Sequence, residues 1–187
     1  MDAIELLTQQ HRDLDALFKR VHGSDGAERT RATGELAELI TLHAALEETF
    51  FYPFAQRAGL RDLVRDAWEE HATVRQLTSE LLQVKQTDPR LDVFTSDIEL
   101  NLRGHIGEEE RDMFPQVRAR VDAGLLRALG QEMLEAIERL RDKELLRVTR
   151  TLGLATVGVA GWLQHAALAA TPAAPQAARE QPQLPAA

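Results

Sequence analysis

The sequence predicts an all-α protein that folds as an up-down-up-down four-helix bundle. Ala, Leu, Glu and Arg are abundant, 44% of the residues are apolar, and the apolar residues recur every three or four positions in four successive segments. These residue types favour helices, and this spacing places the apolar side chains on one face of each helix. Because the expected connections are short, neighbouring helices should run antiparallel.

Each of the four helices is expected to be amphipathic. Their predicted ranges are 4–21, 29–54, 60–85 and 89 to about 113. A turn at 22–28 separates the first two helices, and Gly59 ends the second. Asp88 and Pro89 are a start signal for the fourth, with Asp as N-cap and Pro at the first helical position. Pro115 is expected to end or kink that helix.

The chain is expected to have three parts: a bundle at 1–120, a C-terminal helical extension at 121–170 and a disordered Pro- and Ala-rich tail at 171–187. The extension begins with a helical pattern at 124–148. Its uncharged segment at 152–163 is shorter than the roughly 18 to 20 residues of a membrane-spanning helix. We therefore expect no membrane association, and we expect this segment to dock on the bundle or on a partner.

Composition narrows the classes of function. The net charge of −8 argues against a nucleic-acid partner. The absence of Cys excludes disulfides, thiolate metal sites and Cys nucleophiles. The first residues lack the apolar core of a secretory signal, so a cytoplasmic location is the default expectation.

Polar residues interrupt the apolar faces of all four helices in a repeated order. The first and third helices each carry one His, and the second and fourth each carry a His followed four residues later by a Glu. The six residues are His11, His43, Glu47, His71, His105 and Glu109. The second His–Glu pair lies 62 residues after the first, and an aromatic-Pro dipeptide follows both pairs. The chain therefore resembles two helical hairpins built on one plan.

This pattern predicts a metal site. Residues four apart lie one turn apart on the same helix face, so the six side chains can converge in the core. Two buried carboxylates would be costly unless they are protonated or neutralised by cations. Imidazole and carboxylate ligands suit iron, manganese or zinc, and six ligands exceed the needs of one tetrahedral zinc. We expect two metal ions bridged by Glu47 and Glu109.

Any one of these His residues alone would be interpreted as a buried core histidine, but their recurrence on four successive helices favours the metal site. His22 lies in a turn and His165 in the terminal segment, so neither is expected to be a ligand. Glu48 and Glu110 are expected outside the ligand set or exposed, with Glu110 as an alternative to Glu109.

Four stretches resemble the hemerythrin-like (HHE, cation-binding) domain family over roughly residues 1 to 120. They are HRDLDALF at 11–18, HAALEETFFYP at 43–53, EEH at 69–71 and HIGEEERDMFP at 105–115. The resemblance implies a four-helix bundle around a non-haem di-iron centre, with two iron ions as cofactor and manganese as a possible substitute. It also implies ligand roles for the six residues above.

The sequence departs from the oxygen-carrying hemerythrins at two positions. Those proteins have a further His one turn after the third-helix His and an Asp five residues after the last His, where this chain has Arg75 and Glu110. One iron therefore loses an imidazole, which argues against reversible oxygen transport. Tyr52 could supply a phenol.

The expected function is binding or sensing of a small diatomic molecule (oxygen or nitric oxide) or of peroxide at a carboxylate-bridged metal centre. The C-terminal helices could hold a second copy or a protein partner. The alternatives are a di-iron enzyme that breaks down hydrogen peroxide, and a protein of iron handling or repair. Whether the protein is an enzyme is left open, and a metal-free bundle is the remaining interpretation.

Overall fold

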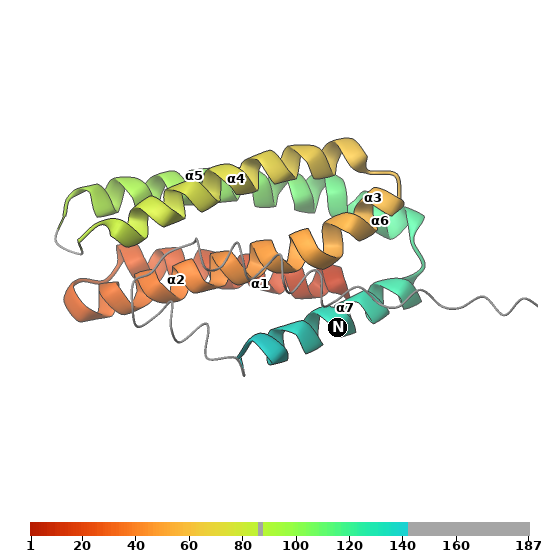
Figure 1. The fold of residues 1–187 in the computed structure, drawn as a ribbon, viewed down its shortest axis with the longest axis horizontal. Helices are drawn as coiled ribbons and strands as arrows, with labels where there is room; N and C mark the ends of the chain where they lie inside the picture. Colours follow the sequence, from red (N-terminus) through yellow and green to blue (C-terminus); the bar gives the residue numbers. More distant parts are fainter. Residues whose placement is uncertain (86–87, 142–187) are drawn as a thin grey trace, which may run out of the picture.

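The computed structural model describes residues 1–85 and 88–141, which form an all-α fold (Figure 1). The elements in chain order are α1 (Ala3–His22), α2 (Gly26–Leu46), η1 (Glu47–Phe51), α3 (Tyr52–Arg57), α4 (Arg61–Gln83), α5 (Arg90–Glu108), η2 (Glu109–Met113), α6 (Phe114–Arg120) and α7 (Ala123–Arg141). The labels η1 and η2 denote π-helical turns. Outside the described residues lie the end of the helix expected at 124–148, the segment at 152–163, His165 and the tail at 171–187.

The predicted bundle is confirmed. Helices α1 and α2 form one hairpin and α4 and α5 form the second, so that the four long helices lie side by side (Figure 1). Helix α7 runs along the first hairpin, on the side away from α4 and α5. No helix among the described residues is long and apolar enough to cross a membrane.

Local sequence signals lie at the starts of two helices. The side chain of Asp88 accepts a hydrogen bond from the backbone N–H of Arg90 at 2.9 Å, but α5 begins at Arg90 with Pro89 as its N-cap, one residue later than predicted. At the start of α1, the Asp2 side chain accepts from the backbone N–H of Glu5, and the Glu5 side chain accepts from the backbone N–H of Asp2. This reciprocal pair is a capping box.

Pro115 does not end the fourth helix, one of the two outcomes expected for it. The helix continues through η2 into α6 and ends at Arg120, and the second helix continues in the same way past Pro53 to Arg57. A proline has no N–H, and its ring clashes with the carbonyl four residues earlier in a regular α-helix. A π-helical turn before each proline widens the helix, because the N–H groups there bond to carbonyls five residues back.

The core consists of two apolar clusters with a polar layer between them. One cluster includes Leu7, Leu46, Ala67 and Met113 at the end of the bundle that α7 covers. The other includes Leu14, Ile40, Val74 and Leu102 at the opposite end. Each bundle helix passes from one cluster to the other, and the six polar residues predicted from the sequence lie at the crossing points.

Helix α7 packs into the first of these clusters. Leu126 and Met133 are buried there together with residues of α1 and η1. Gly130 permits the close approach, because a Cβ atom at that position would lie 2.7 Å from the backbone nitrogen of Ala3 and 2.7 Å from the carbonyl carbon of Asp2. The start of α1 therefore rests directly on the backbone of α7.

Candidate metal centre

The six predicted residues meet in the polar layer. His11 comes from α1, His43 and Glu47 from the junction of α2 with η1, His71 from α4, and His105 and Glu109 from the junction of α5 with η2. All six side chains are buried. Each π-helical turn begins at one of the two Glu residues, and π-helical turns are frequent at functional sites.

The donor atoms form two groups that could each hold a metal ion. The first contains His11, His43, Glu47 and Glu109, and the second contains Glu47, His71 and His105. Within each group, one nitrogen or oxygen atom per residue lies within 4.8 Å of the others. Glu47 belongs to both groups, which is the position of a bridging carboxylate.

The two carboxylates face the imidazoles through their inner oxygens. Oε2 of Glu47 lies 3.2 Å from Nε2 of His43 and 3.2 Å from Nε2 of His71. Oε2 of Glu109 lies 3.4 Å from Nε2 of His11 and 3.6 Å from Nε2 of His105. Each carboxylate is therefore placed between imidazoles from different helices.

Four atoms of this centre are buried without a hydrogen-bond partner among the described residues. They are His11 Nε2, His43 Nε2, Glu47 Oε1 and Glu109 Oε2. Unpaired buried polar atoms are rare in folded proteins, because each one loses its hydrogen bonds to water without replacement. Orphaned nitrogen and oxygen atoms that converge on one point are the donor arrangement that a metal cation satisfies.

Each imidazole uses its other nitrogen, Nδ1, to contact an outer side chain. The partner oxygens are Glu110 Oε1 at 2.8 Å from His11, Gln10 Oε1 at 3.1 Å from His43, Glu48 Oε1 at 2.9 Å from His71 and Glu70 Oε2 at 2.8 Å from His105. In a neutral imidazole, an acceptor at Nδ1 holds the proton on that nitrogen and leaves Nε2 unprotonated, so that Nε2 can give its lone pair to a metal ion. In a metal-loaded protein each ring would therefore turn an unprotonated Nε2 toward the centre.

The two neighbouring residues Glu109 and Glu110 have different positions relative to the centre. Glu109 is 1% exposed and points into the centre, whereas the side chain of Glu110 is 43% exposed and holds His11 from outside. Glu48 has the same outer position at His71. Arg75, which stands where oxygen carriers have a His, bonds the Glu48 carboxylate and so contacts the centre only through Glu48.

Tyr52 adds an oxygen to the centre. Its buried hydroxyl lies 3.0 Å from Nε2 of His71 and donates to Oε1 of Glu109 at 3.1 Å. Burial raises the pKa of Tyr52 well above its ordinary value, and the nearby Glu109 and Glu47 raise it further. The phenol suggested by the sequence therefore lies among the donor atoms and holds its proton in the metal-free protein.

In the metal-free protein, some side chains of the centre carry bound protons that offset the charge of the two carboxylates. Burial lowers the pKa of His43 to about 3, so this ring is neutral at neutral pH. Burial also lowers the pKa of His105, but Glu109, Glu47 and Glu70 outweigh it and raise that pKa well above its ordinary value. Burial and the neighbouring Glu47 raise the pKa of Glu109. Protons thus partly neutralise the centre, and a metal cation would take their place.

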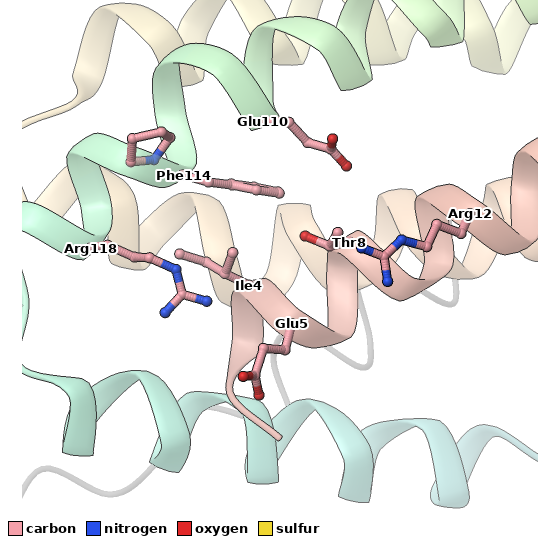
Figure 2. Close-up of a pocket in the computed structure, with 8 residues that line it drawn as sticks. Ile4, Glu5, Thr8, Arg12, Glu110, Phe114 and Arg118 are labelled. Atoms are coloured by element: carbon pink, nitrogen blue, oxygen red, sulfur yellow. The ribbon is translucent and has the colours of Figure 1, made fainter.

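A surface pocket reaches the outer side of the centre. It has a volume of about 460 Å³ and lies between α1 on one side and η2 and α6 on the other (Figure 2). Glu110 and Phe114 line it, but none of the six buried residues does. Phe114 stacks on the ring of His11 with an interplanar angle of 7°, so it separates the pocket from that imidazole.

His22 is not part of the centre, and two residues that are in contact with the centre were not predicted. His22 lies away from the centre, where its Nε2 contacts Oε2 of Glu99 at 2.7 Å. Gln10 and Glu70, the outer partners of His43 and His105, were missed in the sequence. Glu70 directly precedes His71 in the chain but contacts the His of a different helix, so only the packing of α4 against α5 reveals its role.

Comparisons with known proteins agree with this geometry. A family model described as the hemerythrin HHE cation binding domain matches residues 2–117. A crystal structure of a hemerythrin HHE cation binding domain-containing protein from Mycobacterium kansasii aligns with a TM-score of 0.72 and 27% identity, covering 88% of this chain and 98% of that chain. A comparison with curated proteins finds no match. Because the family model covers more than half of the sequence, the chain belongs to the hemerythrin HHE cation-binding domain family.

Proposed function

We propose that the protein holds two iron ions in this centre and uses them to bind or sense oxygen, nitric oxide or peroxide. The observation that carries the proposal is the set of orphaned atoms on His11, His43, Glu47 and Glu109. Cation binding is the chemistry of the family, and these atoms are the ones that a cation would satisfy. The identity and number of the ions, and the molecule that they meet, are the proposed part.

Two ions fit the donor atoms better than one. The atoms form two groups that share Glu47. In addition, Glu109 belongs to the first group and its Oε2 lies 3.6 Å from Nε2 of His105 in the second. Glu47 and Glu109 would therefore bridge the ions, while His11 and His43 would hold one ion and His71 and His105 the other. Nitrogen and oxygen ligands without thiolate suit iron, and manganese is the substitute.

The protein offers the centre one imidazole fewer than the oxygen carriers do. Arg75 is occupied with Glu48, so it supplies no ligand where oxygen carriers have an imidazole. Iron with an open coordination position supplies both a binding site for a small molecule and redox chemistry. Apolar clusters lie on both sides of the polar layer that holds this position.

Breakdown of hydrogen peroxide is the second candidate. Tyr52 favours it, because its hydroxyl both donates a hydrogen bond to a bridging carboxylate and lies beside an imidazole. A phenol in this position can give up a proton and an electron to an oxidant. No specific contact among the described residues favours iron storage or repair over these two functions.

Metal content with an absorption spectrum tests the proposal. We expect about two irons per chain after loading with ferrous iron, and we expect Glu47→Ala and Glu109→Ala to lose metal. The matched control is Glu108→Ala, which removes an exposed carboxylate next to Glu109. Two irons retained in both bridging variants would overturn the bridging assignment, and failure of the wild type to bind iron or manganese would overturn the proposal.

Titration of the loaded protein then separates the two candidates. A sensor should give one spectral change with oxygen, nitric oxide or peroxide and then stop. An enzyme should consume many equivalents of hydrogen peroxide per chain. If a variant that binds no metal consumes peroxide as fast as wild type, the reaction does not occur at this centre.

A further inference from the structure

Tyr52 and Trp68 form an aromatic connection between the centre and the protein surface. The centroids of their rings are 6.1 Å apart, with an interplanar angle of 57°. Tyr52 is fully buried, whereas Trp68 is 39% exposed. Since the Tyr52 hydroxyl contacts both His71 and Glu109, the connection runs from the donor atoms to solvent through two side chains that can be oxidised.

We propose that Tyr52 and Trp68 pass single electrons from an organic reductant at the surface to the buried centre, so that the protein reduces peroxide at the expense of that reductant. This inference rests on the proposed function in its peroxide form and adds to it the class of co-substrate and the place where the co-substrate reacts. The reductant is a one-electron donor, such as a hydroquinone or an aromatic amine, that is too large to enter the bundle.

The proton of Tyr52 has an acceptor in place. When Tyr52 loses an electron, its hydroxyl proton stays within the hydrogen bond to Glu109, whose Oε1 is 3.1 Å away. An electron from Trp68 then restores the tyrosine, and the same proton returns to it. The surface donor refills Trp68. Two such cycles deliver two electrons, and with two protons from solvent one hydrogen peroxide becomes two waters while two donor molecules each lose one electron.

Arg75 sets which of the two rings holds the missing electron. Its guanidinium carbon lies 6.0 Å from the centroid of the Trp68 ring, and a cation above the ring stabilises the neutral indole. Removing an electron from Trp68 beside this positive charge is therefore less favourable. The oxidised residue is therefore Tyr52 as long as no donor is present. When a donor is present at the surface, Trp68 passes an electron to Tyr52 and takes one from the donor.

The composition of the chain makes the test sharp. Tyr52 is the single tyrosine among the 187 residues, so any tyrosyl radical belongs to it. The chain has two tryptophans, Trp68 and Trp162. Trp162→Phe is therefore a matched control for Trp68→Phe.

The first experiment uses the full-length metal-free protein and does not depend on iron. A photo-oxidant in solution removes an electron from exposed tryptophan, and the absorption band of the tyrosyl radical is followed. We expect wild type and Trp162→Phe to show rapid formation of the tyrosyl radical, and Trp68→Phe to lose the rapid phase. Tyr52→Phe should show no tyrosyl band. An unchanged rapid phase in Trp68→Phe would overturn the proposal.

The second experiment uses iron-loaded protein, hydrogen peroxide and a bulky dye that is oxidised by one electron. We expect Trp68→Phe to lower dye oxidation by an order of magnitude or more, while its iron content stays unchanged and Trp162→Phe behaves like wild type. Equal dye oxidation by wild type and Trp68→Phe would overturn the electron route and leave the metal centre standing. A protein that binds no metal but still transfers the radical to Tyr52 would overturn the proposed function and leave the connection standing.

Discussion

Removal of the Glu48 carboxylate is expected to weaken metal binding from outside the ligand set. Glu48 accepts the Nδ1 hydrogen bond of His71 at 2.9 Å, its side chain is only 12% exposed, and Arg75 bonds it from the other side. In Glu48→Ala, His71 loses the group that fixes its orientation and increases its basicity. Such outer partners are typically worth about 10- to 100-fold in metal affinity.

The geometry places Glu48→Ala near the upper end of this range. A 100-fold loss corresponds to about 2.8 kcal/mol, because each ten-fold change is about 1.4 kcal/mol. Glu48→Gln keeps an acceptor oxygen but removes the charge, so about ten-fold is expected. Glu110→Ala should cost less than Glu48→Ala, because the Glu110 side chain is 43% exposed and water can replace it at His11.

Competition with a chelator of known affinity measures these losses. The loaded protein is titrated with the chelator, and the absorption of the centre reports the fraction of metal retained. Glu69→Ala is the matched control, since it removes an exposed carboxylate two residues before His71 on the same helix. The reasoning fails if Glu48→Ala behaves like Glu69→Ala, or if Glu110→Ala has the larger effect.

Three further predictions concern stability. Three of the four imidazoles have a raised pKa in the metal-free protein, so they bind protons more tightly when folded than when unfolded. Their stabilisation is complete below about pH 6.5 and is lost as the pH rises through the raised pKa. The melting temperature of the metal-free protein should therefore fall as the pH rises above about 6.5, and that of the metal-loaded protein should change less. Asp2→Ala should cost about 1 kcal/mol in urea unfolding at neutral pH, because it removes the cap of α1. Burial raises the pKa of Asp2, but the hydrogen bonds from Glu5 and Arg118 outweigh burial, so that the pKa is lowered overall. The stability difference between wild type and Asp2→Ala should therefore shrink as the pH falls through that lowered pKa. Gly130→Ala should destabilise the fold by about 1–3 kcal/mol through the clash with the start of α1. Gly104→Ala, where a Cβ meets open space, should stabilise it by about 1 kcal/mol; equal effects of the two changes would show that α7 does not rest on the start of α1.

The sequence predicted the convergence of the six polar residues because periodicity carries the necessary information. A His on an apolar helix face must point into the core, and His43 with Glu47 must lie on one turn. The structure brings all six together in the core of the bundle, as predicted. The same reasoning placed Glu48 and Glu110 one step around the helix, where each now contacts the outer nitrogen of a His.

Features that depend on contacts between helices could not be predicted in this way. Gln10 and Glu70 hold imidazoles of neighbouring helices, and no spacing within their own helices indicates it. The docking of α7 depends on the absent side chain of Gly130, which in the sequence resembles any helical glycine. Two local features have a signal in the sequence. Asp2 and Glu5 have the spacing of a capping box, and an aromatic-Pro dipeptide stands at the end of each π-helical turn.

The two π-helical turns also determine how this protein can change in length. A π-helical turn holds one residue more than the α-helical turn that would replace it, because its N–H groups bond to carbonyls five rather than four residues back. Deleting one residue from η1 would therefore convert it into an α-helical turn and keep the buried Tyr52 and Ala55 on the core face. The cost would fall on Pro53, whose ring clashes with the carbonyl four residues earlier in a regular α-helix. The same holds for Pro115 after η2. The extra residue before each proline is therefore what allows each helix to continue past it.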